Sequence, residues 1–271
     1  MNTSSSAIIL AAGKGTRMKS DLPKVAHRVA DRSMVEWVVS ACAEAGCSRI
    51  VVVVGYQQQV VREILGGFKW RVGASVVGVE FAVQEEQLGT GHAVRCAEGL
   101  FVREASESGH SVFVLAGDGP LIRSATLRTL LDRHRSSGAS ATLATSVIDD
   151  PSGYGRIVRD GSGRFVGIVE QKNATAEQLR VREVNPSYYC FEARGLFSAL
   201  AEVRRDPVGG EYYVTDMPTL LMRRGDRVEV IDAVPPEDVL SINTPEQLAE
   251  VDRILRGRGG PLPAGKHGGA S

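Results

Sequence analysis

Several features that mark particular classes of protein are missing from this chain of 271 residues. Lysine plus arginine equals aspartate plus glutamate, at 32 each, so no net charge attracts nucleic acid or an anionic membrane. The longest apolar runs, such as residues 50–54, are too short to span a bilayer. Residues 1–6 lack the basic segment of a signal peptide. We therefore expect a cytoplasmic protein with neither nucleic acid nor membrane as a partner.

Common cysteine and phosphate-binding motifs are missing too. The four cysteines have no C-x-x-C spacing and mostly lie in apolar surroundings, so we expect buried free thiols. No G-x-x-x-x-G-K-[ST] string of a Walker loop occurs. A dinucleotide fingerprint is excluded because Met18 stands where its third small residue would be. No internal repeat is evident. Any phosphate binding must therefore be local and of another kind.

The chain is organised around the stretch L-A-A-G-K-G-T-R-M at residues 10–18, with Lys24 shortly after it. Gly13 and Gly15 remove side chains where backbone amides could approach phosphate oxygens. Arg17 and Lys24 bring two positive charges to the same place. We interpret this stretch as a triphosphate-binding loop, and the alternative is a tight turn with solvated cations.

Alternating strand and helix patterns predict a parallel sheet around this loop. An apolar strand is expected over residues 6–11. Ser33 and Glu36 form a capping box that opens a helix over residues 34–45, and a β-branched run over 49–54 is typical of a strand buried on both faces. This order places the first strand at the centre of the sheet and its loop at the carboxyl edge, where ligands bind.

Two further loops are expected at the same edge. In one, Gly89 and Gly91 surround Thr90, a candidate helix N-cap, although turn geometry alone would explain the glycines. In the other, Asp118 ends a central strand between two glycines, where a carboxylate is well placed to hold Mg²⁺; a role in the turn is the alternative. His92 is expected to be an ordinary helix residue.

The remaining elements follow from the same patterns. Alternating residues on both sides of a turn at 160–163 predict an antiparallel hairpin that covers the mouth of the site. The segment 257–271 is rich in glycine and proline and is expected to be disordered. Further helices are expected over residues 58–65, 90–102 and 124–136 and from 244 onward, and further strands over 79–83, 111–116, 139–147, 184–191 and 227–233.

A set of motifs covers about residues 6–255: the glycine loop with L-P-K, then Q-L-G-T-G-H-A, G-D-x-P-L, G-Y-G-R-I, V-E-Q-K-N-A and G-E-Y-Y-V-T-D. This set resembles the uridyltransferase domain of the bacterial N-acetylglucosamine-1-phosphate uridyltransferases, within the sugar nucleotidyltransferases. The resemblance implies an α/β fold with a Rossmann-like, doubly wound mixed sheet. It implies one large nucleotidyltransferase domain over residues 1–256, with an antiparallel sugar-binding extension.

The same resemblance implies a reaction and a set of site residues. The reaction is Mg²⁺-dependent uridylyl transfer from UTP to N-acetylglucosamine 1-phosphate, giving pyrophosphate and UDP-N-acetylglucosamine, a cell-wall precursor. The implied positions are Arg17 and Lys24 at the reacting phosphates, Asp118 and Asn243 on Mg²⁺, Gly155, Glu170 and Asn185 on the sugar, and Leu10, Ala11, Ala12, Gly13, Gly15, Thr16, Gln84, Gly89, Thr90, Ala116 and Gly117 on the nucleotide.

Two departures from the family pattern bear on these expectations. Asn185 is followed by Pro186 and Ser187, where the family has N-T-G, and proline fixes φ and removes an amide donor, so the sugar pocket is expected to differ. The bifunctional relatives also carry a trimerising domain of hexapeptide repeats that transfers acetyl groups. No such repeats occur here, so we expect a single-function enzyme without that trimer.

Several alternatives stay open at this point. Asn243 could bond backbone amides at the helix start, and Glu170 could be a solvated residue at a strand edge. The protein could be a pyrophosphorylase for another hexose 1-phosphate or another nucleotide. It could also be a non-catalytic nucleotide-sugar binding protein, but such a protein is expected to have lost Arg17, Lys24, Asp118 or Asn243, and all four are present.

Overall fold

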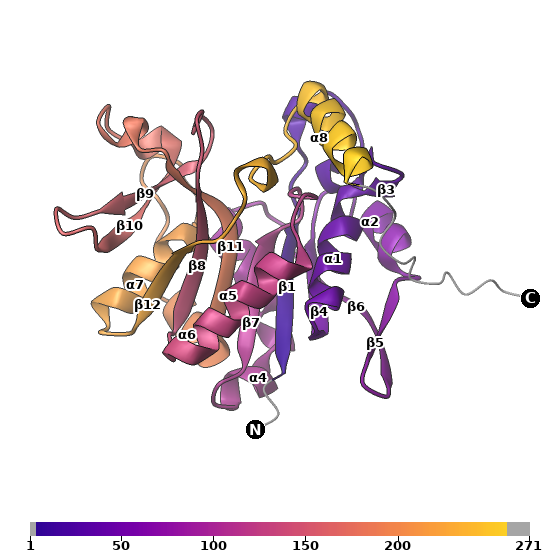
Figure 1. The fold of residues 1–271 in the computed structure, drawn as a ribbon. Helices are drawn as coiled ribbons and strands as arrows, with labels where there is room; N and C mark the ends of the chain where they lie inside the picture. The colour runs from indigo at the N-terminus through magenta and orange to yellow at the C-terminus, as the bar shows by residue number, and fades with distance from the viewer. Residues whose placement is uncertain (1–3, 259–271) are drawn as a thin grey trace, which may run out of the picture.

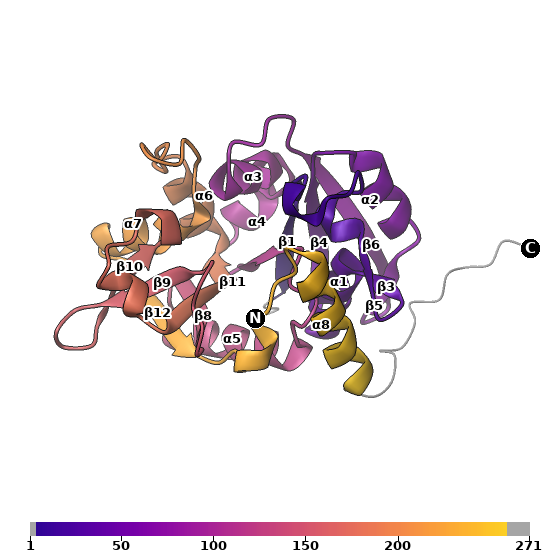
Figure 2. The same cartoon turned by 90° about the horizontal axis from the view of Figure 1, so that it is seen from above.

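The computed structural model describes residues 4–258. Ten strands form one sheet with helices on both faces, which confirms the expected Rossmann-like α/β fold (Figures 1 and 2). The final helix, α8 (Pro245–Gly257), ends where the glycine-rich segment begins. The disordered tail expected over residues 257–271 otherwise lies outside the described residues.

The parallel half of the sheet is built on β1 (Ser5–Ala11), which lies at its centre as predicted. β1 pairs in parallel with β4 (Cys47–Val54) on one side and β7 (Ser111–Ala116) on the other, and β6 (Ser75–Val83) follows β4. The sheet ends at β5 (Lys69–Val72), an antiparallel edge strand that was not predicted. The carboxyl ends of parallel strands lie at the same edge of the sheet, so the loops that follow β1, β6 and β7 lie close together.

The other half of the sheet is largely antiparallel. β11 (Glu183–Glu192) pairs antiparallel with β7, with β8 (Ala141–Val147) and with β9 (Gly155–Arg159). β9 and β10 (Phe165–Val169) form the predicted hairpin, which extends the sheet. β12 (Val228–Asp232) adds to β8 in parallel. The expected antiparallel extension is therefore confirmed.

Helices bury apolar residues against both faces of the sheet. Ala7 and Ile9 of β1 pack into one core and Ile8 into the other, as the alternation of side chains along a strand requires. The capping box of Ser33 and Glu36 is confirmed at the start of the first helix. The helices are α1 (Met34–Glu44), α2 (Gln58–Leu65) and α5 (Ser124–Ser137) on the first face, and α3 (Thr90–Ala97), α4 (Val102–Ser106), α6 (Ala193–Leu200) and α7 (Met217–Arg223) on the second.

The segment after Gly89 differs from the prediction. The helix expected over 90–102 ends at Ala97, and a 3₁₀ turn containing Gly99 separates it from α4, consistent with the poor helix propensity of glycine. The expectation that Thr90 is an N-cap is wrong. Gly89 holds the cap position, and the Thr90 hydroxyl accepts a hydrogen bond from the Val214 amide at 3.0 Å.

A third apolar cluster fixes the C-terminal segment beside the glycine loop. Ile242 and Val251 of the α8 segment are buried against Met18 of η1 (Thr16–Met18) and against Trp37 of α1. Two short strands, β2 (Arg28–Val29) and β3 (Arg32–Ser33), lie beside this cluster. The cluster thus holds the start of α8 near the edge of the sheet where β1 ends (Figure 2).

Two expectations from composition can be compared with the structure. All four cysteines are free, and Cys42, Cys47 and Cys190 are buried, while Cys96 is partly exposed. Within residues 4–258, no helix combines the length and the apolar character needed to cross a membrane.

Candidate active site

Two adjoining cavities open at the carboxyl edge of the sheet. The first has a volume of about 350 Å³ and lies over the ends of β1, β6 and β7. The second has a volume of about 460 Å³ and lies toward the β9–β10 hairpin and the start of α8. Ala116, Asp118 and Ser187 line both cavities, so the two meet at these residues.

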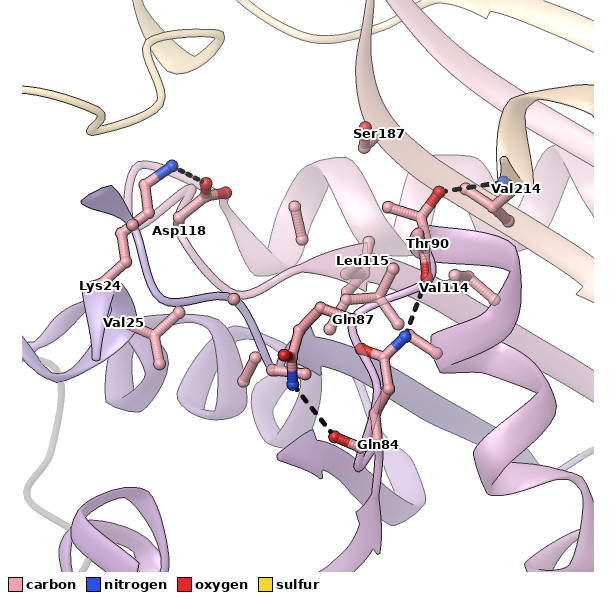
Figure 3. A pocket seen from close by; sticks show the side chains of 18 of the residues that line it. Lys24, Val25, Gln84, Gln87, Thr90, Val114, Leu115, Asp118, Ser187 and Val214 are labelled. Atoms are coloured by element: carbon pink, nitrogen blue, oxygen red, sulfur yellow. Dashed lines mark hydrogen bonds and ion pairs between the residues drawn. The ribbon is translucent and has the colours of Figure 1, made fainter. Parts of the chain in front are cut away.

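The first cavity gathers most of the residues predicted to contact a nucleotide, and Figure 3 shows it with Lys24 and Asp118 at one end and Gln84 and Thr90 at the other. Two predicted residues do not line it. Thr16 is exposed on η1, and Gly117 is buried, with its amide donating to the Leu10 carbonyl at 2.9 Å. The predicted residues that line it are Leu10, Ala11, Ala12, Gly13, Gly15, Gln84, Gly89, Thr90 and Ala116.

The two glycines of the loop serve different structural roles. Gly15 adopts φ +69°, and a Cβ on it would lie 2.5 Å from Cβ of Lys24. Gly15 therefore lets the lysine pack directly against the loop. A Cβ on Gly13 would meet no atom within 4 Å, so Gly13 leaves open space on the cavity side of the loop.

Four predicted residues from separate segments converge where the cavities meet. The Lys24 ammonium contacts the Asp118 carboxylate and donates to Asn243 Oδ1 at 2.6 Å (Figure 3 shows the pair with Asp118). Arg17 donates to the same Asn243 oxygen at 2.7 Å. The Ile242 amide donates to the Asp118 carbonyl at 3.2 Å, which holds the two segments together. The Asn243 side-chain oxygen thus faces cations and does not cap the helix.

The Asp118 and Asn243 oxygens form a donor pair suited to a hard cation. Both oxygens contact one ammonium group, so they converge on the same space, and oxygen ligands are those that Mg²⁺ prefers. Among the described residues, no group of three or more histidines, cysteines or acids could hold a metal. An ion at this pair would therefore need water and phosphate oxygens to complete its octahedron, as is usual for Mg²⁺.

The second cavity brings together the three residues predicted to contact a sugar. A Cβ on Gly155 would lie 3.8 Å from both Glu170 Oε2 and Asn185 Cβ. Glu170 is partly buried and lines the cavity, and burial raises the pKa of its carboxyl group above the usual value. A hydrogen bond at 3.0 Å from the Thr215 hydroxyl, together with the charge of Lys172, opposes that rise. Glu170 can therefore accept hydrogen bonds from ligand hydroxyls or amides in the second cavity.

The Asn185–Ser187 segment adapts to its proline through an irregular strand. The β11–β8 register shifts between Val184 and Tyr188, so the missing Pro186 amide leaves no gap in the ladder. Asn185 accepts from the Ser187 amide at 3.2 Å and donates to the Tyr189 hydroxyl at 2.6 Å. Ser187 adopts φ +66°, a left-handed conformation that non-glycine residues rarely adopt, and it stands where both cavities meet.

Sequence reasoning missed several residues that line or support the cavities. Gln87 lines the first cavity and donates to the Gln84 carbonyl at 3.2 Å (Figure 3). Tyr154 lines the second and donates to the Val239 carbonyl at 3.2 Å. His92, expected to be an ordinary helix residue, contacts the Gln84 side chain at 3.0 Å. Gln87 and His92 lie in the Q-L-G-T-G-H-A segment, so that motif was the available signal.

Comparison with known proteins agrees with this geometry. The family described as the MobA-like NTP transferase domain matches residues 7–216, which include every residue that lines the first cavity. The fold is thus that of a nucleotidyltransferase. The chain belongs to the MobA-like NTP transferase domain family.

Individual relatives are similar over nearly the whole chain. The bifunctional protein GlmU of Pelotomaculum thermopropionicum is 47% identical over 253 residues, which are 93% of this chain and 52% of that protein. The proteins of the same name from Syntrophomonas wolfei and Geobacter metallireducens are 44% and 46% identical, again over 93% of this chain and 53% and 50% of their own lengths. The chain therefore spans about half the length of these curated relatives.

Proposed function

We propose that this protein transfers the uridylyl group of UTP to N-acetylglucosamine 1-phosphate in the presence of Mg²⁺. The products are UDP-N-acetylglucosamine and pyrophosphate. The observation that carries the proposal is the meeting of two cavities at Asp118, with Lys24, Arg17 and Asn243 gathered there. The similarity to the bifunctional GlmU proteins supports the choice of substrates, as does the motif set, which resembles that of uridyltransferases.

In this proposal each cavity takes one substrate. The nucleotide lies in the first cavity, with its phosphates over the open space beside Gly13. The sugar lies in the second, against Gly155, Glu170 and Asn185. An oxygen of the sugar phosphate attacks the α-phosphorus of UTP, the bond from that phosphorus to the bridging oxygen breaks, and pyrophosphate leaves. The attacking phosphate is already ionised, so the protein needs no general base.

The residues at the junction lower the barrier through charge and orientation. Two anions must approach each other, and Lys24 and Arg17 neutralise charge on the transferring group and the pyrophosphate. Asp118 and Asn243 would hold Mg²⁺, which supplies further neutralisation of the phosphates. For a metal to bind there, Lys24 must release its contacts with Asp118 and Asn243 and turn toward phosphate. Loss of either cation is expected to lower the rate by about 10²-fold or more.

The test is pyrophosphate release across a matrix of UTP, dTTP, CTP, ATP and GTP against the 1-phosphates of glucosamine, N-acetylglucosamine, glucose and galactose, with and without Mg²⁺. The proposal predicts the highest rate for UTP with N-acetylglucosamine 1-phosphate. If another sugar 1-phosphate gave the highest rate, the proposed nucleotidyl transfer would stand but the proposed sugar would be wrong. The Pro186–Ser187 segment would then account for the different sugar preference. Binding of UDP-N-acetylglucosamine without turnover of any pair would favour a non-catalytic binding protein.

A further inference from the structure

The Gln84 side chain at the end of β6 is held in one orientation by two neighbours. Gln84 is buried, with 3% of its surface exposed. Its amide nitrogen lies 3.0 Å from the Gly89 carbonyl oxygen and 3.0 Å from His92 Nδ1. A carbonyl can only accept, so the atom facing Gly89 must be the nitrogen of the carboxamide. The Gly89 contact therefore identifies which carboxamide atom is the nitrogen.

The contact with His92 reinforces the same orientation. The Gln84 nitrogen has two hydrogens, one for Gly89 and one for His92, so Nδ1 of His92 accepts. The imidazole proton then resides on Nε2, which lies 3.9 Å from the Cys96 sulfur one helical turn along α3. Because α3 begins directly after Gly89, both acceptors are presented by the one strand-to-helix turn.

Because both contacts use the Gln84 nitrogen, the Gln84 side-chain oxygen is free to face the cavity. Within residues 4–258, no side chain or backbone group donates to Gln84 Oε1, and Gln84 lines the first cavity. Figure 3 shows this oxygen on the cavity side of the carboxamide, turned away from Thr90. The protein therefore presents a fixed acceptor to whatever base enters. Uracil offers an N3–H donor on its pairing edge, whereas cytosine has an acceptor at N3.

We infer that His92 is a positioning residue for nucleobase selection, holding Gln84 so that its oxygen accepts from uracil N3–H and repels cytosine N3. The inference rests on the proposed function in that it places the base of UTP in the first cavity. A mismatched pair of acceptors in a buried site lowers affinity by about 10- to 100-fold. His92 contributes one of the two hydrogen bonds that prevent the amide from turning over. A single neutral hydrogen bond changes an equilibrium constant by about fivefold.

The experiment compares kcat/KM for UTP and CTP at saturating N-acetylglucosamine 1-phosphate in the wild type and three variants. His92→Leu removes the acceptor, and the UTP:CTP ratio is expected to fall about fivefold with little change in kcat for UTP. His92→Asn keeps an acceptor oxygen near the position of Nδ1, and it is expected to restore most of the ratio. Cys96→Ala is the matched control, because Cys96 contacts His92 but not Gln84.

An unchanged ratio in His92→Leu would overturn the inference, and so would an equal loss in His92→Asn and His92→Leu. The affinities of UTP and CTP, measured by titration calorimetry on the same proteins, separate this inference from the proposed function. A wild type that prefers UTP in binding but releases no pyrophosphate refutes the proposed transfer alone. A wild type that binds both nucleotides equally overturns the role assigned to His92.

Discussion

Substitution of Gly15 by alanine should impair the reaction without altering any charge. At φ +69°, alanine costs about 1–2 kcal/mol relative to glycine. Its Cβ would also lie 2.5 Å from Cβ of Lys24, whereas carbon atoms in contact lie about 3.5–4.0 Å apart. Lys24 must therefore move by about 1 Å, and a displacement of that size at a reacting centre lowers turnover by about 10²-fold.

A matched control separates displacement of Lys24 from loss of stability. Gly138 ends α5 at φ +63°, and a Cβ there would meet nothing within 4 Å. Gly138→Ala should therefore lose about the same 1–2 kcal/mol in urea denaturation while keeping the wild-type rate of pyrophosphate release. Equal rates for Gly15→Ala and Gly138→Ala, under conditions where both are folded, would refute the argument that the glycine serves the lysine.

Three further predictions concern single residues. Gly13→Ala should leave the unfolding free energy within about 0.5 kcal/mol of the wild type but weaken UTP in calorimetry, since only a ligand fills the space beside it. Glu170→Gln should raise Tm at pH 7, because burial disfavours the carboxylate, and it should also raise KM for the sugar phosphate. A lower Tm would contradict this. Burial lowers the pKa of His134 to about 4, whereas an unfolded histidine titrates near 6.5. The folded protein is therefore fully stable above pH 6.5, and its free energy of unfolding falls by about 2–3 kcal/mol by pH 4.5. His134→Gln should flatten this part of the pH profile of unfolding.

The sheet and its loops could be predicted because their signals are local. The helix at Gln58–Leu65 and the strand at Ser111–Ala116 have the bounds expected from apolar spacing and flanking turn residues. β5 was missed because its sequence alternates charge with apolar residues over only four positions. α6 was missed because Gly195 interrupts a short apolar pattern.

Contacts between distant residues limited the prediction of the site. Thr90 has the residue type of an N-cap, but its hydroxyl is engaged by an amide 124 residues away, which no local pattern reveals. His92 stands only eight residues from Gln84, yet their contact depends on how a strand turns into a helix. Asp118 and Asn243 were paired only through a family resemblance, and their convergence depends on the buried cluster under α8.

The position of Asn243 in the chain has a consequence for biosynthesis. Every strand of the sheet lies before residue 233, whereas Asn243 and its neighbour Ile242 follow it. On the ribosome, a domain emerges from its N-terminal end, so all ten strands can leave the exit tunnel before the segment that meets Asp118. A nascent chain can therefore assemble its sheet while the junction of the two cavities is still incomplete, and Asn243 can join that junction only after all ten strands have been synthesised.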